Sequence, residues 1–250
     1  MQKVDIILLA GGKGKRFHPV TGDKIAKSLY RLNDLELIKY SIQVIDFSLV
    51  RRLIFALDHH AEMVKEWVEQ QDLPCEVYFS RQDQPGVLGA VEAAEKFIVS
   101  DNFIVCNTDE IREGLSMRRL VEFHEAAPPS VLATMAATVA TSLYHHRVLV
   151  LDDANLVLKT ELKNSYYEEY PDITKPINTG FIIFKKQASK FFNDAYGGDW
   201  SAIINPLVDR HAIQALVNPS ISYFNVGTLQ ELEEASEYIT HRRSKPVLVL

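Results

Sequence analysis

Short apolar runs alternate with stretches of helical periodicity along most of this 250-residue chain. Each apolar run has the length of a buried strand, and the stretches between them have the length of helices. Chains with this pattern fold as βαβ units around a largely parallel sheet, so the alternation predicts an α/β fold. The strands are expected at Val4–Ala10, Leu53–Leu57, Glu76–Phe79, Phe103–Cys106, Val131–Thr138, Val148–Leu151, Ile177–Phe184 and Ser222–Val226.

Three helices are expected where apolar residues recur at helical spacing. The recurring residues are Val64, Trp67 and Val68 within His60–Gln71, then Val87, Val91 and Ile98, and finally Leu232, Ala235 and Ile239. The last helix has the clearest beginning, because Thr228 and Glu231 have the spacing of a capping box.

The pattern becomes richer in strands from about Val131 to Phe184. Within it, the polar and aromatic insert Lys163–Pro176 interrupts the periodicity and is expected to form a loop over one end of the sheet. No Ser/Gly-rich linker, shift of composition or internal repeat divides the chain, so we expect residues 1–250 to form one domain. The apolar tail Pro246–Leu250 is compatible with a closing strand or with a subunit contact, and a homodimer is a reasonable expectation.

Composition excludes several classes of protein. With 47% hydrophobic and 24% charged residues, the chain is typical of globular proteins. Its net charge of −6 argues against a nucleic-acid binder, because such proteins usually need a broad basic field. Two cysteines are too few for a disulfide framework, and no apolar stretch has the length of a membrane span or of a signal peptide. We therefore expect a cytoplasmic protein that does not bind membranes.

The strongest local signal is a glycine-rich turn directly after the first predicted strand. In Leu9-Ala10-Gly11-Gly12-Lys13-Gly14, the three glycines let backbone amides approach a ligand closely. Five basic residues and one acidic residue lie between Lys13 and Lys27, a local net charge of +4 in an acidic chain. Phe17 stands where both the dinucleotide fingerprint and the P-loop require glycine. The turn therefore predicts a phosphate-binding loop of another kind.

The segment from Leu9 to Thr21, followed by Ala26-Lys27-Ser28-Leu29, resembles the signature of the sugar-1-phosphate nucleotidyltransferases. In that family L-A-G-G-x-G-x-R-L-x-P-x-T leads to P-K-P-L. Four later segments are similar to further family motifs and follow in family order: Arg81–Ala90, Asn107-Thr108-Asp109, Ile177-Asn178-Thr179-Gly180 and Phe224–Thr228. The resemblance implies a single three-layer αβα, Rossmann-like domain with a mixed, mostly parallel central sheet.

The resemblance also implies an enzyme that joins a nucleoside triphosphate to a sugar 1-phosphate and releases pyrophosphate. Positioning and electrostatic stabilisation supply most of the catalysis in phosphoryl chemistry of this kind. Arg16 offers a planar fork for the leaving pyrophosphate, and Lys27 is implied as the cation beside the α-phosphate. Asp109 follows a short buried run, so it is expected at the carboxyl end of a strand as a ligand of Mg²⁺.

Binding residues follow from the same motifs. The nucleotide is expected at Leu9, Ala10, Gly11, Gly12, Lys13, Gly14, Gln82 and Gly86, where Gln82 can pair with a base edge and Gly86 lets the backbone approach the ring. The sugar phosphate is expected at Glu161, Lys163, Asn178 and Thr179. Neither set identifies the base or the sugar.

Asn225 departs from the family pattern, because it stands where the second metal-binding carboxylate is usual. Three interpretations remain open. Asn225 is a neutral metal ligand, or the ion is held mainly by Asp109 and the triphosphate, or the site is catalytically impaired. We favour an active enzyme, since the glycine loop, Arg16, Lys27 and Asp109 are all present.

The sequence leaves two other functions open. A metal-dependent glycosyltransferase that consumes a nucleotide sugar uses a similar layered architecture, but it does not need the triphosphate loop. A nucleotide-sugar sensor without catalysis is made plausible by Asn225. The histidine pairs His59-His60 and His145-His146 do not predict a metal site, because neighbouring side chains diverge and no Cys or carboxylate stands at a ligand spacing.

Overall fold

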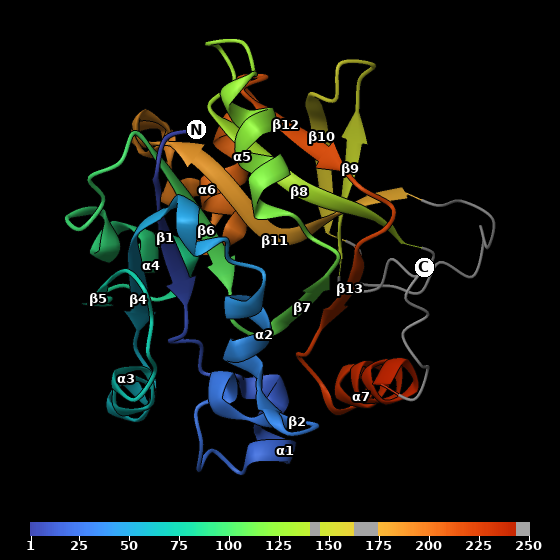
Figure 1. Cartoon of the computed structure of the whole chain (residues 1–250). Helices are drawn as coiled ribbons and strands as arrows, with labels where there is room; N and C mark the ends of the chain where they lie inside the picture. The colour runs from blue at the N-terminus through green and yellow to red at the C-terminus, as the bar shows by residue number, and fades with distance from the viewer. Residues whose placement is uncertain (141–145, 163–174, 244–250) are drawn as a thin grey trace.

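The computed structural model describes residues 1–140, 146–162 and 175–243, and its central feature is a nine-stranded mixed sheet (Figure 1). The sheet runs β10-β9-β11-β6-β1-β4-β5, and β8 joins it beside β11 and carries β12. The strands of this sheet are β1 Val4–Leu9, β4 Val50–Leu57, β5 Glu76–Arg81, β6 Asn102–Asn107, β8 Ala133–Ala140, β9 Arg147–Leu151, β10 Val157–Leu162, β11 Lys175–Lys185 and β12 Ile213–Val217. Two small sheets pair β2 Arg31–Leu32 with β3 Leu35–Glu36, and β7 Glu110–Glu113 with β13 Ser222–Asn225.

The α-helices flank the sheet. They are α1 His18–Thr21, α2 Leu37–Gln43, α3 Ala61–Glu69, α4 Gly86–Glu95, α5 Met117–Glu125, α6 Trp200–Val208 and α7 Leu229–Arg243. Short 3₁₀ helices are η1 Lys15–Phe17, η2 Lys27–Leu29, η3 Phe47–Leu49, η4 Lys186–Phe191 and η5 Asp194–Tyr196. Among the described helices, none combines the length and the apolar character needed to cross a membrane.

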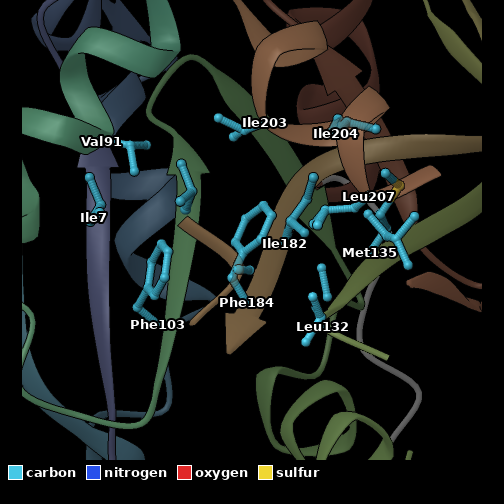
Figure 2. Close-up of a cluster of buried hydrophobic side chains, with 14 of the residues drawn as sticks. Ile7, Val91, Phe103, Leu132, Met135, Ile182, Phe184, Ile203, Ile204 and Leu207 are labelled. Carbon is cyan, nitrogen blue, oxygen red and sulfur yellow. The ribbon is translucent and has the colours of Figure 1, made fainter. Parts of the chain in front are cut away.

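Strand periodicity divides the core into two layers, because successive side chains point to opposite faces of the sheet. On β1, Ile7 belongs to the core beneath α4 and α6, whereas Ile6 and Leu8 belong to the core beneath α2, α3 and α5. Figure 2 shows the first of these cores, with Ile7 and Phe103 of the sheet opposite helical residues. Helices therefore cover both faces, and the predicted three-layer α/β architecture is confirmed.

A third hydrophobic cluster contains residues from the early part and from the late part of the described chain. Phe17, in the turn after β1, is fully buried and packs in the same cluster as Leu232 and Ala235 of α7. The side chain of Asn33 accepts a hydrogen bond from the Ser236 hydroxyl at 3.0 Å. The last helix thus supports the segment that follows the first strand.

The parallel strands place the site. β1 lies between β4 and β6 and runs parallel to both, with Leu9 opposite Ala56 and Asn107. Because the carboxyl ends of these strands meet at one edge, the glycine turn, Asp58 and Asp109 gather there. The expected position of Asp109 beyond a strand end is confirmed.

Most of the predicted elements are present with shifted ends. The eight expected strands correspond to β1, β4, β5, β6, β8, β9, β11 and β13, although β13 pairs with β7 outside the central sheet. The expected helix around Val91 ends at Glu95, and Ile98 is buried in the same core just beyond it. Lys175 and Pro176 begin β11 instead of belonging to a loop, and residues 163–174 of the predicted insert lie outside the described residues.

Candidate active site

The glycine turn has a shape that excludes side chains at two positions. A Cβ on Gly11 would overlap the backbone nitrogen of Asp58, and the Gly11 carbonyl accepts a hydrogen bond from the His59 amide at 3.2 Å. Gly14 has φ 56°, in the left-handed region that favours glycine. A Cβ there would also lie 3.3 Å from the Lys27 side chain. The turn therefore depends on glycine both for its backbone and for close packing.

Lys27 is held beneath this turn by its surroundings. Its ammonium lies 5.4 Å from the centre of the Phe17 ring, and that ring packs edge-on against Tyr30 at 5.2 Å. Phe17 itself is fixed by a 2.7 Å hydrogen bond from its amide to the Gly14 carbonyl. The side chain of Lys27 is 13% exposed, so it is largely shielded from bulk water.

Lys27 and Asp109, 82 residues apart in sequence, form an ion pair with Nζ 2.5 Å from Oδ2. Burial acts to raise the pKa of Asp109, but the charges of Lys27 and Arg112, together with hydrogen bonds to the carboxylate, hold that pKa below its ordinary value. The carboxylate is therefore ionised at neutral pH. Ionised carboxylate oxygen is the ligand type that Mg²⁺ prefers.

A buried polar network that the sequence analysis did not identify supports Asp109. Arg112 is 1% exposed, and it forms an ion pair with Glu110 and donates to the Thr179 carbonyl at 2.5 Å. Asn107 donates to the Glu110 carboxylate at 2.7 Å. These contacts connect the residues on both sides of Asp109 to β11. The sequence signal that could have revealed this network is the pair of charged residues Glu110 and Arg112 shortly after the buried strand β6. Ionised groups are buried only when they have partners.

Two cavities meet at Asn107 and Asp109. The first, of about 430 Å³, is bounded by the glycine turn and by the β5–α4 connection, and its lining includes Leu9, Gly11, Gly12, Lys13, Gln82 and Gly86. The second, of about 410 Å³, is bounded by residues of several strands and loops, and its lining includes Arg16, Glu110, His146, Asn178, Tyr223 and Asn225. A larger cavity of about 760 Å³ between α2, β7 and α7 contains none of the predicted site residues.

Most predicted nucleotide residues therefore come together in the first cavity. Ala10 and Gly14 are exceptions, since neither lines it. Ala10 is buried and its amide donates to the Ala56 carbonyl, whereas Gly14 packs on Lys27. Arg16 is exposed and lines the second cavity. Its guanidinium lies close to Gly227, because a Cβ built on that glycine would be 3.3 Å from Arg16 Nη2.

The predicted sugar-phosphate residues are not all brought together. Asn178 lines the second cavity, but Thr179 is fully buried and its hydroxyl donates to the Ala136 carbonyl at 2.8 Å. Its hydroxyl is thus used within the sheet, and Thr179 lines neither cavity. Glu161 lies on β10, pairs with Lys159 at 2.7 Å and lines neither cavity, while Lys163 lies outside the described residues.

Asn225 lies beside Asp109. The amide of the next residue, Val226, donates to the Asp109 carbonyl at 2.9 Å, and both Asn225 and Asp109 line the second cavity. The Asn225 side-chain amide donates to Glu231 at 3.4 Å. Carboxylate and amide oxygens at this edge are chemically suited to a hard divalent cation, so Asp109 and Asn225 could act as its ligands.

The expectation that His59 and His60 diverge and lack a carboxylate partner is wrong. His59 and His60 do have a carboxylate partner, Asp23, because the turn after α1 folds back onto the β4–α3 connection. His59 Nε2 lies 2.7 Å and His60 Nε2 3.3 Å from the same Asp23 oxygen. His145 lies outside the described residues, and His146 lines the second cavity.

Sequence comparison relates the chain to known proteins over most of its length. It is 24% identical over 246 residues to the bifunctional protein GlmU of Clostridioides difficile, covering 97% of this chain and 51% of that protein. It is 24% identical over 100 residues to D-glycero-alpha-D-manno-heptose 1-phosphate guanylyltransferase of Campylobacter jejuni, covering 40% of this chain and 45% of that protein. The chain thus spans about half the length of the curated relatives it matches.

Structural comparison supports the fold. The crystal structure of HddC from Yersinia pseudotuberculosis superposes with a TM-score of 0.75 at 22% identity, covering 94% of this chain and 99% of that one. The sequence profile of the family described as nucleotidyl transferase matches residues 5–242. The match includes the glycine turn, Lys27, Asp109 and Asn225. The chain therefore belongs to the nucleotidyl transferase family.

Proposed function

We propose that this protein transfers a nucleoside monophosphate from a nucleoside triphosphate to a sugar 1-phosphate, releasing pyrophosphate. The observation that carries the proposal is the ion pair of Asp109, which lines both cavities, with Lys27, which lines neither but contacts Asp109 directly. One cavity contains the glycine turn suited to a triphosphate, and the other offers Asn178 and Arg16 for a phosphorylated acceptor. A transfer reaction requires both substrates to bind with their reacting groups next to each other, beside charged residues.

In the proposed reaction, an oxygen of the sugar phosphate attacks the α-phosphorus in line, and the bond from that phosphorus to the pyrophosphate oxygen breaks. Amides of the glycine turn bind phosphate oxygens, and Lys27 offsets the negative charge that accumulates at the α-phosphate. Asp109, with Asn225, would hold Mg²⁺. When bound there, the ion would supply further neutralisation of phosphate charge.

Gln82 and Gly86 are the proposed base contacts, because both line the cavity of the glycine turn. Asn178 is the proposed sugar contact among the residues that the structure describes. The name of one relative, a heptose 1-phosphate guanylyltransferase, supports the choice of a sugar phosphate as acceptor. It does not identify the base or the sugar for this chain.

The cellular setting and the domain organisation remain part of the proposal. We propose a cytoplasmic enzyme of one domain, consistent with two free thiols, Cys75 and Cys106. Burial raises the pKa of the Cys106 thiol to about 11, so that thiol is unreactive. A homodimer through the apolar tail stays a prediction, because residues 244–250 lie outside the described part of the chain.

The test is a substrate screen. The purified protein is incubated with Mg²⁺, each common nucleoside triphosphate and a panel of sugar 1-phosphates, and pyrophosphate and nucleotide sugar are measured. Pyrophosphate release that requires the sugar phosphate is the expected result. Transfer of sugar from a preformed nucleotide sugar would instead support a glycosyltransferase, and binding without turnover would support a sensor.

A further inference from the structure

Three histidines surround one carboxylate outside the two cavities of the candidate active site. The nearest Asp23 oxygen lies 2.7 Å from His59 Nε2, 3.3 Å from His60 Nε2 and 3.5 Å from His18 Nε2. The ligand atoms of Asp23, His59 and His60 all lie within 4.8 Å of one another. None of these four residues lines either cavity, so the cluster is a separate feature of the surface.

Two distant parts of the chain supply the cluster. His18 begins α1 and Asp23 follows it, while His59 and His60 form the connection between β4 and α3. The two neighbouring histidines do not diverge, because His60 has φ 54° and its ring lies 4.0 Å from the ring of His59, centre to centre. The left-handed backbone turns both imidazoles toward Asp23, whose own φ is 56°.

From this convergence, we infer that Asp23, His59 and His60 form a binding site for a Zn²⁺-like transition-metal ion, with His18 at its edge. Two imidazole nitrogens and one carboxylate oxygen are ligands typical of zinc, and a water molecule can complete the tetrahedron. Zinc bonds of about 2.0–2.2 Å place neighbouring tetrahedral ligands about 3.3–3.6 Å apart. The distances from the Asp23 oxygen to His59 Nε2 and His60 Nε2, 2.7 and 3.3 Å, are close to that spacing.

The surroundings permit the ion to bind. The side chains of Asp23, His59 and His60 are 22% to 47% exposed, so an ion can enter from solvent. His18 Nε2 lies 2.9 Å from the Lys13 carbonyl, so His18 keeps that contact and is not needed as a ligand. Three protein ligands would leave one position of the ion for water.

The site would fix the glycine turn from outside. The His59 amide donates to the Gly11 carbonyl at 3.2 Å, and His18 directly follows η1, the 3₁₀ helix after the turn. An ion joining His59 to Asp23, which lies just beyond α1, would therefore link both flanks of the glycine turn. This role differs from that of the Mg²⁺ site at Asp109, which uses oxygen ligands at the strand ends.

Cobalt provides the test, because four-coordinate Co²⁺ has intense visible absorption whereas six-coordinate Co²⁺ has weak absorption. The full chain, free of any affinity tag, is stripped with a chelator and titrated with Co²⁺. One equivalent is expected to produce the intense spectrum, and Zn²⁺ is expected to remove it. His59→Ala and His60→Asn are each expected to weaken Co²⁺ binding by at least about tenfold, since even outer-shell partners of metal sites contribute that much.

His241→Ala, which removes an exposed histidine elsewhere, and Asp109→Asn, which removes the candidate Mg²⁺ ligand, are matched controls that keep the spectrum. His60→Asn preserves a residue that tolerates left-handed backbone, so it guards against misfolding. Absence of the intense spectrum, or its persistence in both His59→Ala and His60→Asn, would show that the cluster is an ion-pair network only. Because the spectrum is measured without nucleotide, it is independent of the transferase assay.

Discussion

Lys27 is the residue on which the proposed chemistry depends most directly. Lys27→Ala removes the cation beside Asp109, so we expect turnover to fall roughly 10²–10³-fold, the usual effect of losing one preorganised charge-stabilising group. Pyrophosphate release measures this loss, and thermal unfolding measures stability, which should change little by comparison. A variant with near-wild-type turnover would contradict the role of Lys27.

The position of Arg16 bears on which phosphate it binds, that of the sugar 1-phosphate or that of the leaving pyrophosphate. The side chain lines the second cavity, whereas the family resemblance implies a clamp for the leaving pyrophosphate. Arg16→Ala should therefore reduce turnover, and the accompanying change in KM identifies the phosphate that Arg16 binds. We expect KM for the sugar 1-phosphate to rise more than KM for the nucleoside triphosphate. Steady-state kinetics with each substrate varied in turn make the comparison, and a rise confined to the triphosphate would overturn the structural placement.

Asn225 offers a direct test of the proposed Mg²⁺ site. Asn225→Asp restores a second carboxylate next to Asp109, and we expect half-maximal activity at a lower Mg²⁺ concentration. Activity measured across a Mg²⁺ titration shows the shift, and Asn218→Asp, at a distant turn, is the matched control. An identical titration curve for Asn225→Asp and the parent would place Asn225 outside the metal shell.

The position of a residue could be predicted where a motif specified both residue type and strand position. Asp109 and the glycine turn are examples, because a strand end fixes where the next residues lie. Thr179 shows the limit of such prediction. Its neighbours in β11 line the second cavity, but successive side chains alternate in direction along the strand, and the Thr179 hydroxyl is hydrogen-bonded to a carbonyl of the neighbouring strand. The contact of Asp23 with His59 and His60 could not be predicted, because the backbone turns at both places lack a sequence signature.

At the scale of elements, Gly180 allows β11 to pass Glu110. It has φ 62°, and a Cβ there would overlap the Glu110 carboxylate. Gly180→Ala should therefore lower the free energy of unfolding by roughly 2–4 kcal/mol, the range of core substitutions that combine strain and overlap. Denaturant unfolding measures the change.

Gly22 is the matched control for Gly180, because its φ is 59° and a Cβ there meets nothing within 4 Å. Gly22→Ala should cost only about 1–2 kcal/mol, the usual penalty of left-handed backbone for a residue with a Cβ. Equal losses for Gly180→Ala and Gly22→Ala would show that contact with Glu110 contributes nothing.

Element prediction succeeded for continuous apolar runs and failed where the pattern was mixed. The strand β7 was missed because its sequence Glu110-Ile111-Arg112-Glu113 is mostly charged, although Arg112 is buried through its partners. The helix α6 was missed although it is apolar. Pro206 lies inside it and leaves the Ala202 carbonyl without its usual helical donor, and that carbonyl instead accepts the Asn193 amide at 3.0 Å.

At the scale of the whole molecule, stability should depend on pH through His124. This histidine of α5 is 1% exposed, and burial, assisted by the positive charge of Lys185, lowers its pKa from 6.5 to about 4. Nδ1 lies 2.8 Å from the Thr134 hydroxyl, while Nε2 has no hydrogen-bond partner among the described residues. The native state therefore holds the imidazole neutral.

The sign follows from proton binding. As pH falls from 6.5 toward 4, the unfolded state takes up the proton before the native state does, so the free energy of unfolding decreases, by roughly 3 kcal/mol in total. His124→Gln should remove this part of the pH dependence, whereas His241→Gln, at an exposed position, should preserve it. Denaturant unfolding at several pH values checks the difference. Parallel curves for His124→Gln and the parent would contradict the assignment.

The whole architecture was predictable in outline, because strand periodicity and the order of motifs both indicated a layered α/β fold. The mixed part of the sheet was harder to predict. β11 pairs antiparallel with β6 and β8, and β12 pairs parallel with β8, so neighbours in the sheet are far apart in sequence. Local patterns do not specify such pairings, since they depend on which long connections close favourably.

The burial of Phe17 against Leu232 and Ala235 has a consequence for biosynthesis. The glycine turn leaves the ribosome early, but the helix that supports it is among the last parts of the described chain to be translated. A nascent chain therefore carries its glycine turn without this support until the residues of α7 have emerged. Competence to bind nucleotide should arise only after α7 has been translated, and a stalled chain lacking α7 should not hold nucleotide.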